Sequence, residues 1–164
     1  MKKSVFLLAM ALLLLWSCPF SQASELPPIP PMPEKFKKIQ IDKPDPSVPK
    51  DIAEFLGEWE GVWKYTGAGR PGLNFGADYR KARIIVFEVT PTKVKFLYGC
   101  GESPYFADRG GWSRHVSTIT EEFGKKRFSR RAGDGFRMTV HLEDGLLKTE
   151  GGALDVEGEF RRIK

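Results

Sequence analysis

The chain has 164 residues, of which 41% are hydrophobic, which is enough for one domain with a core. Its net charge is +5, and it falls to +3, with 24 basic and 21 acidic residues, if the segment carrying Lys2 and Lys3 is removed. A charge this small does not by itself indicate nucleic-acid binding, so no nucleic-acid partner is expected.

Residues 1–23 have the pattern of a secretory signal peptide. Lys2 and Lys3 precede an apolar run, Val5–Trp16, which is too short for a comfortable transmembrane helix. Ser21-Gln22-Ala23 places small residues at both positions that a signal peptidase reads, so cleavage is expected after Ala23. The pattern predicts a periplasmic or secreted protein.

A second processing signal overlaps the first. Leu15-Trp16-Ser17-Cys18 resembles a bacterial lipoprotein box, in which Cys18 would be lipidated, although the bulky Trp16 departs from that pattern. A membrane-anchored lipoprotein is therefore the alternative, and lipidation of Cys18 is the only route to a membrane that we expect. Cleavage after Ala23 leaves Cys100 as the sole cysteine, which excludes an intramolecular disulfide.

Residues 24–50 are expected to form a proline-rich, flexible tether. Eight of the twelve prolines lie here, and such a run favours extended polyproline II over a place inside a sheet. The alternative is that Phe36–Ile41 docks onto the domain that follows, residues 51–164.

The domain is expected to open with a short helix and a strand. Pro49 suits a helix start and Gly57 its end. Trp59, Gly61, Trp63 and Tyr65 then alternate with charged residues, which predicts a strand with one aromatic face.

Seven further strands follow at short intervals, which predicts an all-β, eight-stranded, antiparallel up-and-down barrel. The hairpin signal at Asp144-Gly145 is the strongest of the turn signals. The expected strands are Tyr79–Thr90, Lys93–Gly99, Trp112–Thr120, Phe123–Arg131, Phe136–Leu142, Leu146–Glu150 and Ala153–Ile163.

The lengths of the connections separate the two ends of such a barrel. Tight turns and the helix shut one end, whereas the long connections Thr66–Asp78 and Cys100–Gly111 share the other and form the expected mouth. The second of them carries Tyr105 and Phe106. The inward phase of the last strand also brings Arg162 beside Trp59 at the shut end, where a cation–π contact is expected.

Gly57-Glu58-Trp59 after a short helix, with Arg162 in the last strand, resembles the lipocalin and wider calycin pattern. There the tryptophan packs under an arginine from the final strand. The resemblance covers Asp51–Ile163 and implies a barrel closed at Gly57, Trp59 and Arg162. The barrel is shorter than a typical lipocalin, so a small cavity is expected, and the usual lipocalin disulfide is absent because Cys100 has no mature partner.

No catalytic or metal site stands out. Ser113 and His115 share a strand face without an orienting acid or a nucleophile elbow, so an esterase is only a distant alternative. His115 and His141 have no metal-ligand spacing, and no metal or other cofactor is expected.

An interior cation is the more specific interpretation of the basic strands. Arg114 is followed by His115, and Arg127 by Phe128, and neighbouring residues of a strand point to opposite faces of the sheet. In each strand, either the arginine or its neighbour must therefore point inward. Calycin-type fatty-acid binders hold a carboxylate with internal arginines, so the resemblance makes Arg114 and Arg127 candidate anion ligands.

The function expected from the sequence is binding of a small apolar or amphipathic molecule, with or without an acidic group. Trp63 and Tyr65 would line the cavity, and Tyr105 and Phe106 its mouth. The alternative is a packed barrel that acts as a protein-binding, inhibitor or envelope-assembly module, since eight strands can be filled by side chains alone.

Overall fold

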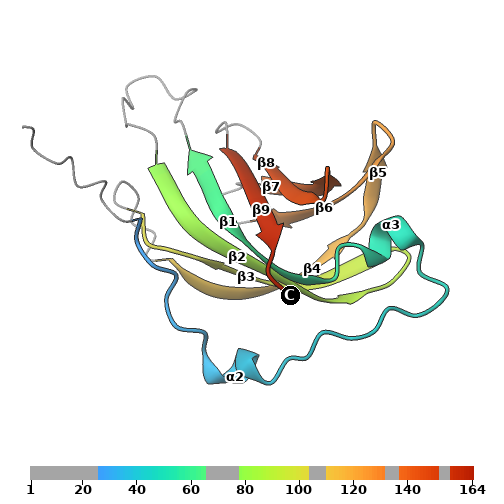
Figure 1. Cartoon of the computed structure of the whole chain (residues 1–164), viewed down its shortest axis with the longest axis horizontal. Coiled ribbons are helices and arrows are strands. Elements are labelled where there is room, and N and C mark those ends of the chain that lie inside the picture. Colours follow the sequence, from blue (N-terminus) through green and yellow to red (C-terminus); the bar gives the residue numbers. More distant parts are fainter. Residues whose placement is uncertain (1–25, 66–77, 104–109, 132–136, 152–155) are drawn as a thin grey trace, which may run out of the picture.

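The computed structural model describes residues 26–65, 78–103, 110–131, 137–151 and 156–164, which form one curled antiparallel sheet (Figure 1). The strand order is β4-β3-β2-β1-β9-β8-β7-β6-β5, so the first long strand pairs with the last, as in an up-and-down meander. The strands are β1 (Gly57–Tyr65), β2 (Asp78–Val89), β3 (Lys93–Cys100), β4 (Gly111–Thr118), β5 (Thr120–Glu122), β6 (Lys125–Arg131), β7 (Arg137–Glu143), β8 (Leu146–Gly151) and β9 (Val156–Arg162). The helices are α2 (Glu34–Lys37) and α3 (Lys50–Ala53).

The all-β antiparallel class is confirmed, but the described residues contain nine strands rather than the predicted eight. The extra strand arises because the chain breaks at Ile119, whose N–H donates to Thr92 O at 2.8 Å. Before this break β4 pairs with β3, and after it β5 pairs with β6. One continuous segment therefore supplies both edges of the sheet.

The sheet curls until these two edges meet at a gap between β4 and residues 128–131 of β6, which we call the seam. No backbone ladder joins β4 to β6 among the described residues. Two bonds that involve side chains cross it instead, from Ser129 N–H to Ser117 Oγ at 2.9 Å and from Arg130 Nε to His115 Nε2 at 3.3 Å. The sheet is thus a barrel left open along one line.

The core fills the interior at the end nearer α3, which we call the closed half. Phe55 comes from the loop after α3 and meets the ring of Phe128 edge-on at 5.2 Å, and Phe96 lies 4.9 Å from Phe128. These rings, together with Phe160 and Leu147, have no solvent exposure or almost none. The tight turns after β2, β5 and β7 lie at this same end, because each joins strands that terminate there.

Trp59 and Arg162 meet at the closed end, as the phase of the last strand predicts. They are register partners in β1 and β9, and Arg162 Cζ lies 4.3 Å from the indole centroid. Arg162 also donates to Leu56 O and Glu54 O, each at 2.5 Å. One side chain therefore ties the last strand to both the tryptophan and the segment before β1.

Residues 26–49, which we call the strap, lie along the outer face of β2 and β3 and carry α2 below the sheet in Figure 1. Phe36 packs on Ile85, Phe87 and Leu97, and Asp42 N–H donates to Phe87 O at 2.9 Å. The expected tether is thus packed against the sheet, and the docking of Phe36–Ile41 is the alternative that the structure shows. No helix among the described residues is long and apolar enough to span a bilayer.

Candidate functional site

The interior away from α3, which we call the open half, is polar. Arg80 enters it from the start of β2, with 2% of its surface exposed, and lies 4.7 Å over the ring of Trp63. Arg130 enters from β6 and lies 4.3 Å over the ring of Tyr98. Two guanidinium groups are therefore stacked on aromatic rings inside the curl of the sheet.

Burial also changes the pKa of Tyr98, whose phenol lies near both cations. Tyr98 is 2% exposed, and desolvation raises the pKa of its hydroxyl well above the ordinary range. Tyr98 is therefore neutral at every physiological pH, and Arg80 and Arg130 are cations that act on its hydroxyl.

Two buried polar atoms in the open half have no hydrogen-bond partner among the described residues: Trp63 Nε1 and Thr149 Oγ1. Both flank Gly158, where an added Cβ would lie 2.5 Å from the Thr149 hydroxyl and 2.9 Å from Trp63 Cβ. Glycine therefore lets β9 pass close behind these side chains. An unpaired buried donor costs about 1–3 kcal/mol, so a group that accepts from Trp63 would recover stability.

His115 stands on the inner side of the seam. Its ring stacks on Phe96 at 5.2 Å, its Nε2 lies 2.7 Å from Ser113 Oγ, and Arg130 Nε donates to the same nitrogen at 3.3 Å. Burial and the neighbouring Arg130 lower the pKa of His115 to about 4, so the ring is neutral at pH 7.

The Ser113–His115 contact does not form a hydrolytic triad among the described residues. A triad needs an acid that orients the imidazole, and the groups that contact His115 there are a serine, an arginine and a phenylalanine. Within the same part of the chain, no three His, Cys, Asp or Glu side chains gather as metal ligands.

The expectation of an interior Arg114 or Arg127 is wrong. Arg114 lies on the outer face, 5.2 Å over Phe87, and Arg127 makes 3.3 Å ion pairs on the outside with Glu122 and Glu150. The strand phase is opposite to the one proposed, because the apolar Phe128 takes the inward position. Arg80 and Arg130 are the interior cations instead.

The structure describes only some of the other candidate ligand residues. Trp63 is buried in the open half, as expected for a cavity wall. The side chain of Tyr65, and Tyr105 and Phe106, lie outside the described residues. Arg80 was missed although a signal existed, since it has the phase of Ala82 and Ile84 on one strand, and Arg130 has the phase of Phe128.

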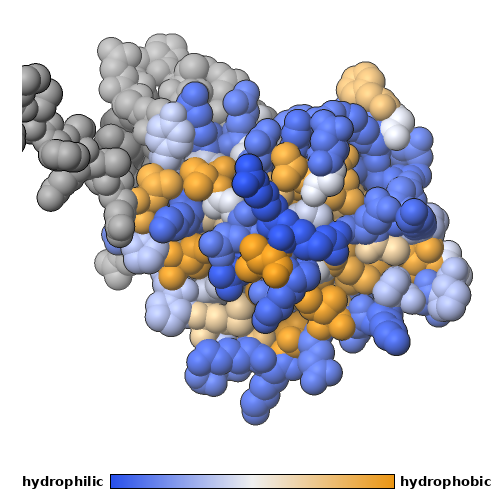
Figure 2. Space-filling model, viewed as in Figure 1, coloured by the Kyte–Doolittle hydropathy of each residue, from blue (hydrophilic) through white to orange (hydrophobic). Residues whose placement is uncertain are grey.

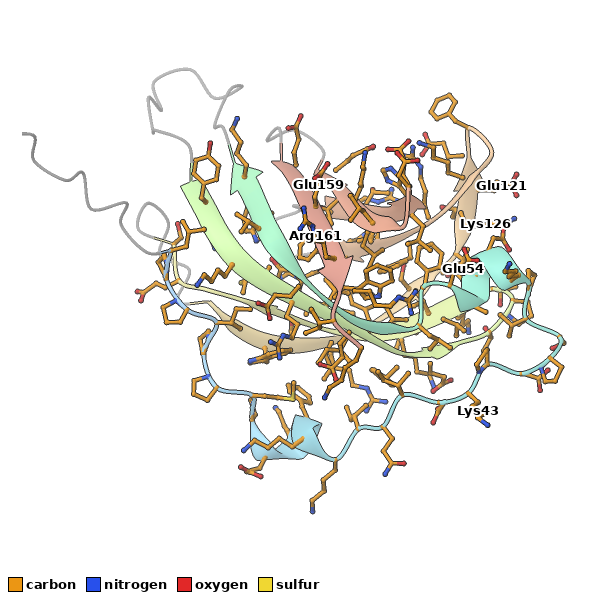
Figure 3. The ribbon with its side chains drawn as sticks, viewed as in Figure 1. Lys43, Glu54, Glu121, Lys126, Glu159 and Arg161 are labelled. Atoms are coloured by element: carbon orange, nitrogen blue, oxygen red, sulfur yellow. The ribbon has the colours of Figure 1, made fainter. Side chains whose placement is uncertain are left out.

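A second concave region lies on the outer face of β8, β9 and β1. This groove has a volume of about 680 Å³, and Gly61 and Gly158 thin its floor. Charges of both signs line it, and Glu159 and Arg161 mark its position on β9 in Figure 3. The space-filling view shows the same face of the molecule as a mixture of hydrophilic and apolar side chains (Figure 2).

No family model matches the chain, and no curated protein sequence does. Among solved structures, it is similar to a fluorescence-activating β-barrel made by de novo design, with 17% identity and a TM-score of 0.47 over 70% of this chain and 99% of that one. A TM-score below 0.5 carries no inference about function, which therefore rests on the residues of the chain itself.

Proposed function

We propose that the chain binds a small amphipathic molecule in the open half of the curled sheet, with the polar or acidic group of the ligand toward Arg80 and Arg130. The observation that carries the proposal is the unpaired Trp63 Nε1, a buried donor beside a buried guanidinium group. Binding sites of this kind combine apolar walls with a few convergent polar groups. Here the indole and phenol rings supply the walls.

The closed half limits the size of the ligand. Phe55, Phe96, Phe128 and Phe160 fill that end, so a long acyl chain cannot run the length of the interior. The ligand is therefore compact. This agrees with the small cavity expected from a barrel shorter than a typical lipocalin. As part of the proposal, we assign the fold to the lipocalin-like class on the pattern of Gly57, Trp59 and Arg162.

A second candidate function is supported by the groove on β8, β9 and β1. It lies on the outer surface, so it would serve a packed barrel that binds another protein. We further propose that the chain is exported and non-enzymatic, with anchoring through Cys18 as the alternative to release.

The experiment uses an anionic naphthalene-sulfonate probe, whose fluorescence rises in apolar surroundings, with energy transfer from tryptophan as the readout. We expect about one probe per chain, and weaker binding of an uncharged analogue. Arg80→Met should weaken binding of the anionic probe by at least about tenfold, because it removes a desolvated charge.

Arg83→Met is the matched control. Arg83 lies on the same strand but points outward, where it pairs with Glu60, so its loss should leave probe binding unchanged. Melting temperatures of both variants show whether each is folded. Absence of saturable binding, or equal weakening in the two variants, would contradict the interior site and favour the packed barrel.

A further inference from the structure

The seam differs from the neighbouring outer face of β6, β7 and β8 in how its cations are neutralised. On the outer face of β6, β7 and β8, Lys125 and Lys148 both pair with Glu143, and Arg127 pairs with two glutamates. At the seam, Arg131 and Arg137 have no carboxylate partner among the described residues. Within that part of the chain, two guanidinium groups at the seam are left without a counter-charge.

These two arginines line a pocket of about 440 Å³ at the seam. No carboxylate is among the described residues that line it, which are His115, Val116, Ser117, Thr118, Thr120, Ser129, Arg131 and Arg137. The lining is therefore positive and rich in hydroxyl groups. It is distinct from the groove on β8, β9 and β1, where acidic and basic groups alternate.

At this pocket, hydrogen-bond donors without a partner outnumber acceptors among the described residues. Ser129 Oγ accepts from Arg137 Nε at 3.1 Å and from Nη2 at 3.0 Å, so its own hydrogen remains to be donated. A site with spare N–H and O–H donors and few acceptors suits a ligand that only accepts.

The narrowness of the seam argues against a different occupant. The free backbone edges of β4 and β6 could in principle admit an added strand. However, the bond from Ser129 N–H to Ser117 Oγ, at 2.9 Å, already closes the gap, and an inserted strand needs about 4.8 Å on each side. A compact ligand fits where a polypeptide does not.

From the unpaired Arg131 and Arg137, the hydroxyl-lined pocket and the closed seam, we propose that the seam binds an oxyanion of the phosphate or sulfate type. Ser129 Oγ already takes the Nε–Nη2 edge of Arg137, so the Nη1–Nη2 edge of its guanidinium group is the one that matches two oxygens of such a group. This site is separate from the interior site of the proposed function, because Arg131 and Arg137 lie on the solvent side of the strands.

The test titrates sulfate and inorganic phosphate into the mature chain, at constant ionic strength set by chloride. Backbone amide shifts of Ser117 and Ser129 report on binding in solution. We expect saturable shifts at these residues, and an affinity lowered at least about tenfold in Arg131→Gln/Arg137→Gln. Arg137→Lys should recover only part of it, because lysine lacks the fork.

Lys64→Gln/Arg161→Gln is the charge-matched control, since it also removes two positive charges and both side chains line the other groove. It should leave the shifts unchanged. Equal weakening in this variant would show that the binding is a general effect of net charge, and the absence of saturation would overturn the site. Methyl phosphate separates the two sources of the anion: tighter binding than inorganic phosphate indicates a phosphorylated larger molecule, and weaker binding indicates a free ion.

Discussion

The closed and open halves of one interior have opposite chemistry. The closed half is filled by phenylalanine rings from four different segments, whereas Arg80, Tyr98, Arg130 and Thr149 line the open half. The same strands cross both halves, so the difference lies in which residues each strand places at its two ends. In the function proposed above, the packed half accounts for stability and the polar half for recognition of the ligand. Four measurements test this division.

The largest effect is expected from Phe128→Ala in the closed half. Phe128 is fully buried between Phe55 and Phe96, so the substitution should lower the free energy of unfolding by about 3–5 kcal/mol. Chemical denaturation measures this. Phe123→Ala on the same hairpin is the control, because that ring is 87% exposed and its loss should cost less than about 0.5 kcal/mol. Similar losses would mean that the closed half is not the core.

Acid should destabilise the protein through the open half. His115 has a folded-state pKa of about 4, below its ordinary 6.5. Between these two pH values the imidazole is protonated in the unfolded chain but not in the folded one. The free energy of unfolding should therefore fall by about 1–2 kcal/mol as pH drops from about 6.5 to about 4, less than the full shift implies because the ring is partly exposed.

An NMR titration of the His115 ring protons checks the pKa directly. Burial lowers the pKa of His141 too, so the fall is shared. His115→Gln should lose the part due to His115 and retain the part due to His141 and to Glu143. The pKa of Glu143 is lowered by hydrogen bonds from Lys125 and Lys148. A His115 that titrates near 6.5 would contradict its burial beside Arg130.

The coupling between Trp59 and Arg162 should be about 1 kcal/mol in a double-mutant cycle of Trp59→Ala and Arg162→Met. The cation–π contact is lost in either single variant, so the double variant should be more stable than the sum of the two predicts. Purely additive losses would show that the two side chains stabilise the closed end independently.

The smallest effect has the opposite sign. Thr149→Val replaces a buried hydroxyl that has no partner among the described residues with a methyl group of similar volume. Thermal unfolding should therefore show equal stability or a gain of up to about 1 kcal/mol. A clear loss of stability would reveal a partner for the hydroxyl and remove part of the case for a vacant polar site.

Much of the fold was predictable because most strands alternate cleanly. Trp59 and Trp63 set the inward face of β1, and the phase of β9 brought Arg162 to the correct neighbour. The sequence of β2 also indicates the strap. Ile85 and Phe87 make its outer face apolar as well, which is typical of a face that is covered.

The errors fall where alternation gives no signal. In β4, arginine, histidine and serine occupy both faces, so the phase of Arg114 depends on the pairing with β3. The break at Ile119 is made by a long-range bond to Thr92 O and not by a local turn residue. The interior cations could have been predicted, because Arg80 has the phase of Ile84. The strand phase was not applied to it, because a charged residue is an unexpected neighbour for a hydrophobic core.

The start of the strap sets the direction in which the open half would face in an anchored chain. Trp112 Nε1 donates to Pro30 O at 2.7 Å, and a Cβ at Gly101 would lie 2.6 Å from Pro27 O, so the strap begins beside the ends of β3 and β4 that belong to the open half. From Cys18 to Pro27 a fully extended chain reaches about 30 Å. In a protein lipidated at Cys18, the alternative proposed above, the open half would therefore lie on the side of the anchor and within that distance of the bilayer, where the proposed binding would act on amphipathic molecules at the membrane surface.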